Sequence, residues 1–331
     1  MTHLPTGIHR DISDESYHAD TLCDRLTLSS SLARQIIGQS PLHAWTAHPR
    51  LNPDWEPTEK KTFDIGRAAH RAVLGQGSDY AEIPESYLAS NGAASTKAAK
   101  DFIAESREAG LTPLKGAEIA QIEMMAARAR YRMAENGITL DPADSEVTAL
   151  AEVEGVMCRA RIDNAPEKAM RLPGAPGPRK VMIDFKTCES ATDESCRRAV
   201  ENYAYDFPAQ FYAETWEAAT DERRDMLFVF QEKAAPFEVK LIFLLNEPGH
   251  SGDWFEDARQ KTAAARALWG ECLTTNRWPG YANGIVTLGA RPFYRQAWQD
   301  RAAMISQTSK PAAAALRAAY DAQSPHRMAG E

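Results

Sequence analysis

The chain has 331 residues, of which 44% are apolar and 25% are charged, a composition typical of globular proteins. This length predicts one large domain or two small ones with a substantial core. The formal net charge of −8 and the isoelectric point of about 5.6 argue against a general nucleic-acid coat protein, but they allow an enzyme with a locally basic groove.

The cysteines and the chain start indicate the compartment. Five cysteines are scattered without a Cys-x-x-Cys pair, which predicts reduced thiols in a cytoplasmic protein. The polar, acidic start predicts no signal peptide, and the apolar run at 241–245 is too short to span a membrane.

The first part of the chain is predicted to be mainly helical. A short helix begins after Ser29 or Ser30 as its N-cap and ends at Gly38, before the breaker Pro41. After a loop at 48–60, a second helix covers residues 62–77 and ends at its glycines, Gly75 and Gly77. Residues 95–136 are also predicted to be mostly helical.

The later part combines strands with helices. A hairpin is expected at 145–163, and further strands are expected at 181–187, 226–232 and 237–245. Helices are expected at 193–217, where Pro208 is expected to bend or interrupt the helix, and at 254–272. A sheet with flanking helices in one unit predicts an α/β or mixed α+β fold.

We expect residues 1–310 to form a single domain. Its parts are a helical N-terminal part at 28–138, a sheet core at 139–245 and a C-terminal helical part at 246–310. The Ala-rich tail at 311–331 is expected to be a loose helix or disordered.

The strand at 181–187 places an acid and a base on one face. Because successive side chains of a strand point to opposite faces, Asp184 and Lys186 lie together while Val181, Ile183 and Phe185 face a core. Taken alone, such a pair is more often a solvated salt bridge than a catalytic pair.

The hairpin adds two more acids. If Glu154 and Gly155 centre its turn, Glu146 lies opposite Asp163, although an odd-length loop would break this register. Facing acids repel unless a cation or a proton lies between them. A site for a hard divalent cation, which takes oxygen ligands and activates water, would explain the arrangement, with Lys186 orienting the water or stabilising developing charge.

His70 is predicted to lie on the inward face of the helix at 62–77, one turn after Gly66. Helical side chains lean over the preceding turn, where Gly66 leaves space. His70 can therefore reach a metal, but a core histidine bonded to a carbonyl fits the same pattern.

In order, these motifs resemble the RecB-like branch of the PD-(D/E)xK nucleases, and in detail the RecE, or exonuclease VIII, family of prophage exonucleases. The similar segments are SSSLARQIIGQSP, FDIGRAAHRAVL, GVMCRARID, IDFKT, QFYAE and FVFQEKAAPFEV, within about residues 28–245. The usual proline before the first aspartate is replaced by Ile162, a position that RecB-like members commonly vary. The resemblance implies a restriction-endonuclease-like core with a helical insertion.

The resemblance also implies roles for individual residues. Mg²⁺ or Mn²⁺ would be held by His70, Asp163, Asp184 and the carbonyl of Phe185. Lys186 would be the catalytic lysine, assisted by Glu146 and by Gln210 on the following helix. DNA would be contacted by Gln210 with Tyr205 or Tyr212, whereas Arg159 and Arg161 either touch phosphates or neutralise the acids. The cysteine spacing does not match that of related iron–sulfur nucleases, so no cluster is expected.

By this resemblance, the protein is expected to degrade one strand of linear duplex DNA from an end, in the 5′ to 3′ sense. It would leave a single-stranded tail for a strand-annealing protein in recombination, and it would form a ring-like homo-oligomer without membrane association. Two alternatives stay open: an endonuclease of the same fold, and a non-catalytic DNA-binding or recombinase-loading factor. The intact set of His70, Asp163, Asp184 and Lys186 argues against the non-catalytic alternative.

Overall fold

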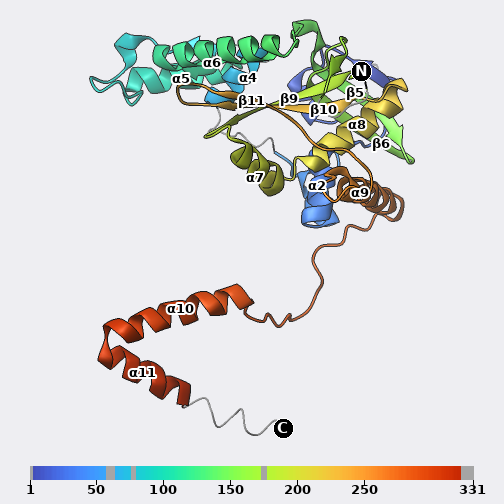
Figure 1. The fold of residues 1–331 in the computed structure, drawn as a ribbon. Helices are drawn as coiled ribbons and strands as arrows, with labels where there is room; N and C mark the ends of the chain where they lie inside the picture. The colour runs from blue at the N-terminus through green and yellow to red at the C-terminus, as the bar shows by residue number, and fades with distance from the viewer. Residues whose placement is uncertain (1–2, 57–63, 76–79, 173–176, 322–331) are drawn as a thin grey trace. The chain divides into compact units, whose positions relative to one another are not determined.

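The computed structural model describes residues 3–56, 64–75, 80–172 and 177–321 (Figure 1). The chain divides into two compact units, Met1–Tyr281 and Ala282–Glu331. The sequence predicts a domain of residues 1–310 and a tail of 311–331, whereas the observed division falls after Tyr281.

A mixed sheet of seven strands, counted within the described residues, forms the centre of the first unit (Figure 1). The strand order is β1-β5-β6-β9-β10-β11, with β2 paired to β6. The β9–β10 and β2–β6 pairs are parallel and the others are antiparallel. The strands are β1 (Gly7–His9), β2 (Leu28–Ser29), β5 (Ser145–Val153), β6 (Val156–Asn164), β9 (Val181–Cys188), β10 (Asp225–Glu232) and β11 (Val239–Phe243).

Helices cover both faces of the sheet. On one face, α4 (Asp64–Leu74) and α6 (Gly116–Glu135) pack in a cluster that includes Ile183 and Phe185. On the other face, α8 (Asp206–Thr220) packs in a cluster that includes Met182 and Phe228 (Figure 1). The predicted class, a mixed sheet flanked by helices, is confirmed.

The other elements are shorter or more peripheral. The helices are α1 (Asp14–His18), α2 (Ser30–Gly38), α3 (Pro41–Ala47), α5 (Lys97–Glu108), α7 (Asp193–Tyr203), α9 (Phe255–Thr275), α10 (Pro292–Thr308) and α11 (Lys310–Asp321). The strand pairs are β3 (Tyr80–Glu82) with β4 (Thr112–Leu114), and β7 (Met170–Arg171) with β8 (Pro178–Arg179). Two short 3₁₀ turns cover Glu85–Tyr87 and Pro142–Asp144. Within the described ranges, no helix is both long and apolar enough to cross a membrane.

Helix boundaries follow the local sequence signals, with two exceptions at prolines. Ser29 caps α2 by accepting the Leu32 N–H, as predicted. Pro41 begins α3 rather than only ending α2, because the first position of a helix needs no N–H. For the same reason Pro208 fits in the first turn of α8, and the chain instead breaks at Ala204, which has a φ of 48°.

Two further expectations are refined. Residues 95–136 form two helices, α5 and α6, separated by the short strand β4. The start of the Ala-rich tail is the helix α11, whereas residues 322–331 lie outside the described residues, as do Gly77 and the end of the loop at 48–60.

The β5–β6 hairpin has the predicted register. Glu154 and Gly155 form a two-residue turn with φ values of 51° and 80°, the conformation that matches the twist of hairpin strands. Val147 pairs with Ile162, so Glu146 lies opposite Asp163. The φ of Glu146 is 51°, within the left-handed region that a glutamate rarely adopts.

Candidate metal centre

Three side chains from different elements converge at the open end of the hairpin. His70 comes from α4, Glu146 from β5 and Asp163 from β6. The Nε2 atom of His70 lies 3.0 Å from Oδ2 of Asp163, and its Nδ1 atom lies 3.4 Å from Oε1 of Glu146. One ligand atom from each residue falls within 4.8 Å of the other two. The long-range contact between helix and hairpin that the sequence predicted is therefore present.

The backbone of β9 fixes Asp163. Strands β6 and β9 are paired through Asn164 and Ile183. Beyond that pair, the N–H of Phe185 donates to Oδ2 of Asp163 at 2.7 Å. Because β6 and β9 separate beyond this pair, the Phe185 N–H is free to bind the Asp163 carboxylate and orient it.

Asp184 and Lys186 form the predicted pair on the next strand. The Nζ atom of Lys186 lies 2.7 Å from the Asp184 carboxylate. It also lies 5.4 Å from the centre of the Tyr205 ring, which places Tyr205 beside the lysine. The apolar neighbours Ile183 and Phe185 are buried in the cluster on the other face, as predicted.

The carboxylates have different proton affinities. Burial, together with the negative charge of Asp163, raises the pKa of Glu146 to about 7. Burial and the same neighbouring charge raise the pKa of Asp184 to about 6, although Lys186 opposes the shift. Burial acts the same way on Asp163, but the charge and hydrogen bond of His70 outweigh it and lower the pKa of Asp163.

The two bases hold their protons firmly. Burial alone would lower the pKa of His70, but the charge and hydrogen bond of Asp163, with the charge of Glu146, raise it to about 9. The pKa of Lys186 is raised in the same way by Asp184 and Asp163 against the effect of burial. The cluster therefore already contains positive charges that balance its carboxylates.

This donor set fits a divalent cation. One imidazole and two carboxylates are ligands that suit Mn²⁺, and carboxylates suit Mg²⁺. The three donor atoms lie within 4.8 Å of one another, so one cation can lie among them. A divalent cation that displaces the protons of both His70 and Glu146 would leave the net charge of the site unchanged.

The structure groups the predicted ligands differently from the sequence. Glu146 completes the close group with His70 and Asp163, whereas the carboxylate of Asp184 is bound by Lys186. Phe185 contributes its N–H to Asp163. The roles of Asp184 and of the Phe185 carbonyl as metal ligands stay predictions.

Glu146→Asn should cost activity but not stability. Asn tolerates a left-handed backbone better than Glu, and the substitution removes a half-buried carboxyl group. Because the folded state raises the pKa of Glu146 from 4.5 to about 7, it binds that proton more tightly than the unfolded state, so ionisation destabilises the fold as pH rises through this range. We therefore expect the difference in Tm between the variant and wild type, measured in EDTA, to be more positive at pH 8 than at pH 5. A variant whose Tm falls by several degrees at pH 8 would contradict the assignment.

Gly66 brings α4 close to β9. A Cβ at this position would have Thr187 Oγ1 as its nearest described neighbour, at 3.6 Å, so the space beside Gly66 faces the strand next to Lys186. The expectation that this space serves the His70 side chain is therefore replaced by a helix–strand contact.

Two substitutions at Gly66 should act in opposite directions. Gly66→Ala fits at ordinary contact distance and gains helix propensity, so unfolding free energy should rise by up to about 1 kcal/mol. Gly66→Leu should push α4 away from β9, displace His70 and lower cleavage at least tenfold. Thermal melts and cleavage rates of both variants check this prediction, and a fully active Leu variant would refute it.

Arg159 and Arg161, the two candidates for contact with DNA phosphates, both contact other side chains of the protein. Arg159 is only 3% exposed, and its Nη1 atom donates to the Asp20 carboxylate and to the Thr27 carbonyl. Its predicted contact with DNA is therefore wrong for this structure, because the guanidinium is buried and paired. The guanidinium of Arg161 stacks 4.3 Å from the Tyr17 ring, and its Nε atom lies 3.9 Å from Glu146 Oε2. Arg161 thus fits the alternative role of neutralising an acid.

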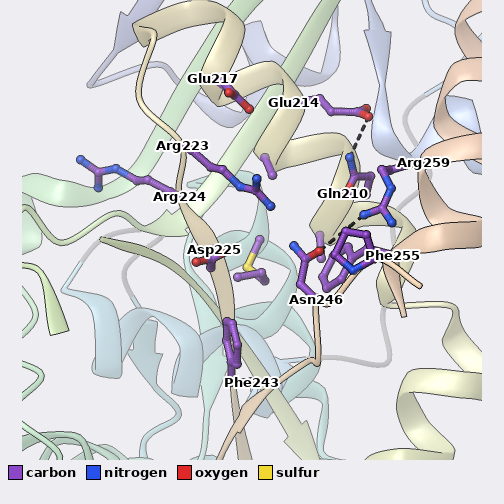
Figure 2. Close-up of a pocket in the computed structure, with 14 residues that line it drawn as sticks. Gln210, Glu214, Glu217, Arg223, Arg224, Asp225, Phe243, Asn246, Phe255 and Arg259 are labelled. Atoms are coloured by element: carbon purple, nitrogen blue, oxygen red, sulfur yellow. Dashed lines mark hydrogen bonds between the residues drawn. The ribbon is translucent and has the colours of Figure 1, made fainter. Parts of the chain in front are cut away.

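Gln210 lies apart from the acidic cluster. Its Nε2 atom donates to Oε1 of Glu214 at 2.7 Å. Figure 2 shows both side chains lining a cavity of about 380 Å³, together with Arg259 and Asn246. The amide of Gln210 is therefore bonded within its own helix, and its predicted role beside Lys186 stays a prediction. Tyr212, on the same helix, packs among apolar side chains, and burial raises its pKa well above the usual value.

Comparison with known proteins agrees with this geometry. The family model of a PDDEXK-like domain of unknown function (DUF3799) matches residues 29–288. The chain belongs to this family. Membership in the PDDEXK-like family places the chain in the PD-(D/E)xK nuclease superfamily, as the sequence motifs predicted.

A solved structure supports the fold of this PDDEXK-like protein. The chain is similar to a "putative exonuclease" from Eubacterium rectale, with a TM-score of 0.50 and 13% identity over 86% of this chain and 97% of that one. At this identity the likeness concerns the fold alone. No curated protein matches the sequence significantly.

Proposed function

We propose that the protein is a metal-dependent exodeoxyribonuclease that degrades one strand of linear duplex DNA. The observation that carries the metal-dependent nuclease activity is the convergence of His70, Glu146 and Asp163 beside the Asp184–Lys186 pair. The exonuclease mode rests on the sequence resemblance to the RecE family. A charge-balanced cluster of acids and bases at the end of a sheet suits phosphodiester hydrolysis better than DNA binding alone, because acids repel phosphates unless a cation is present.

Each residue has a definable task in this proposal. His70, Glu146 and Asp163 would hold Mg²⁺ or Mn²⁺, which polarises a phosphoryl oxygen and lowers the pKa of bound water. The Phe185 N–H donates to the Asp163 carboxylate and keeps it oriented, as hydrogen bonds to the ligating groups do in other metal sites. The Lys186 ammonium, anchored by Asp184, would stabilise the negative charge that develops on the phosphate.

The finer features rest on the sequence resemblance to the RecE family. They are the 5′ to 3′ direction, a cytoplasmic ring-like homo-oligomer, and a single-stranded product passed to an annealing protein. The predicted DNA contact of Tyr205 or Tyr212 and the predicted role of Gln210 in cleavage also rest on this resemblance alone.

Tyr203 offers a surface for the DNA strand beside the lysine. Its ring is 60% exposed and stacks on Tyr205 with centroids 5.6 Å apart. Tyr205 in turn lies under Lys186 and on Phe228, so the stack leads from the surface to the proposed catalytic group. An exposed aromatic face binds an unpaired base by stacking.

Tyr203→Ala should therefore raise KM for DNA about fivefold with little change in kcat, which corresponds to about 1 kcal/mol of stacking. Steady-state kinetics on an end-labelled duplex measures this. Tyr131→Ala, at a site on α6 with 56% exposure, is the matched control and should leave both constants unchanged. A Tyr203 variant with an unaltered KM would remove the residue from the proposed DNA path.

The substrate preference separates the proposed function from its alternatives. Linear duplex and covalently closed circular duplex of one sequence are incubated in equal mass with Mg²⁺. We expect nucleotides or short fragments, and a long single-stranded remainder, from the linear DNA only. Nicking or linearisation of the circle at a comparable rate would favour an endonuclease. Binding of both DNAs without acid-soluble product in Mg²⁺ and in Mn²⁺ would favour a non-catalytic DNA-binding protein.

A further inference from the structure

The second compact unit differs in charge from the rest of the chain. Residues 282–331 contain six Lys or Arg against three Asp or Glu, whereas the whole chain has a formal net charge of −8. The unit begins at Ala282, and the family match ends at residue 288, before α10 begins at Pro292. The basic helices of this unit therefore lie beyond the segment that matches the PDDEXK-like family.

Helix α10 concentrates cations and aromatic rings on one side. Positions three, four, seven and ten residues after Arg291 share a helical face. They are Tyr294, Arg295, Trp298 and Arg301. Asp300 points away from this face and accepts a hydrogen bond from Gln296 at 2.8 Å. We call the face formed by Arg291, Tyr294, Arg295, Trp298 and Arg301 the aromatic–arginine face.

The aromatic–arginine face is exposed and its charges are not paired. Tyr294 is 69% exposed and Trp298 is 57% exposed. Within this second unit, none of the described residues is an ion-pair partner for the three arginines of this face, and all three are exposed. Ile305 lies farther along the same side of α10 and is half-buried. The exposed part of this side is therefore in the N-terminal half of the helix.

We propose that the aromatic–arginine face is a binding site for single-stranded DNA. Arginines neutralise phosphates and aromatic rings stack on unpaired bases, and their alternation on one surface is the composition that single-strand binding requires. An acidic nuclease chain needs a local positive surface to retain a polyanion, and α10 provides one. If the bound strand is the unpaired strand that the nuclease itself produces, that identification rests on the proposed function. The proposal that the face binds single-stranded DNA does not rest on it.

A protein partner fits the face less well. The cores of protein interfaces are depleted of charge, whereas three of the five side chains on this face are unpaired arginines. The helix also offers a control on its other side, where Phe293 is 68% exposed and lies on the side that carries Asp300. Both sides therefore carry an exposed aromatic ring, and only the aromatic–arginine face combines such rings with arginines.

The test is fluorescence anisotropy of a labelled, unstructured oligonucleotide with the full chain in EDTA, so that no strand is consumed. Tyr294→Ala with Trp298→Ala should weaken binding at least tenfold. Replacing Arg291, Arg295 and Arg301 by Gln should weaken binding and reduce the slope of log K against log salt by about 2, since each phosphate contact on a single strand contributes roughly 0.7. Phe293→Ala should stay within twofold of wild type. Circular dichroism confirms that α10 remains folded.

Three results would overturn the proposal. The first is wild-type affinity in the Tyr294 and Trp298 double variant. The second is that the double variant loses as much affinity for a duplex of the same length as for the single strand, which would indicate attraction to the phosphate backbone without stacking. The third is a changed oligomeric state in sedimentation velocity with unchanged oligonucleotide binding, which would identify a protein interface.

Failure of this site and failure of the nuclease proposal are distinguishable. If the full chain binds the oligonucleotide through α10 but releases no nucleotide in Mg²⁺, the binding site stands and the nuclease function fails. If the α10 variants bind normally while wild type cleaves linear DNA, the nuclease function stands and the binding site fails.

Discussion

Asp163→Asn should abolish cleavage of DNA while the protein stays folded. Asn keeps an oxygen that accepts the Phe185 N–H, so the contact between β6 and β9 is preserved. The substitution removes the negative charge that holds His70 and that would bind the metal. We expect a loss of at least about 10³-fold in kcat/KM, equivalent to roughly 4 kcal/mol, together with weaker Mn²⁺ binding.

Asp144→Asn is the matched control for this variant. The side chain of Asp144 is 17% exposed, the same fraction as that of Asp163, and it also faces a cationic partner, Arg10. Losing that ion pair should change cleavage less than threefold. Cleavage of an end-labelled duplex by the two variants, with circular dichroism of each, measures the contrast. A fully active Asp163 variant would mean that the site lies elsewhere.

Substitutions of Lys186 should stop cleavage and spare metal binding. A charged lysine has no lone pair to give a metal, so its loss removes charge stabilisation in the transition state rather than a ligand. Lys186→Gln leaves Asp184 buried without its cation, which destabilises the fold and raises the pKa of Asp184 further. Lys186→Arg keeps that ion pair but moves the charge, so it tests position separately from fold.

We expect both Lys186 variants to lose about 10²- to 10³-fold in kcat. Mn²⁺ affinity by calorimetry should stay within a few fold of wild type in Lys186→Arg. Lys180→Gln is the control, since Lys180 directly precedes the same strand and pairs with Glu167 and Glu222 on the surface. If Lys186→Arg loses Mn²⁺ binding while remaining folded, the lysine would have a different role from the one proposed.

The parts of the site that depend on local rules could be predicted from the sequence. The two-residue turn at Glu154 and Gly155 sets the hairpin register, and that register alone places Glu146 opposite Asp163. Strand alternation places Asp184 beside Lys186 in the same way. Both patterns have a fixed period, so few alternatives compete with them.

The contacts that were missed join segments far apart in the chain. The partner of Arg159 is Asp20, 139 residues away, and Arg161 stacks on Tyr17 in the N-terminal segment. No spacing rule connects such positions, so the sequence could not decide between contact with DNA phosphates and neutralisation of acids. Gln210 is different, because Glu214 lies four residues later and competes for its amide. That signal was available in the helical spacing.

The positive φ of Glu146 is a third kind of omission. Sequence patterns describe an ordinary strand residue there, and nothing in the hairpin's alternation indicates a left-handed backbone. Such a conformation costs of the order of 1–3 kcal/mol and persists where surrounding contacts hold it, most often at functional sites. Its position beside His70 agrees with the proposed metal centre.

The release of acid-soluble nucleotides from uniformly labelled linear duplex DNA, with Mg²⁺ and with EDTA, tests the nuclease function most directly. The proposed site predicts progressive release by wild-type protein in Mg²⁺ and none in EDTA, because the cluster of His70, Glu146 and Asp163 requires the cation to act on a phosphate. Equal release in EDTA, or no release in either Mg²⁺ or Mn²⁺, would contradict it.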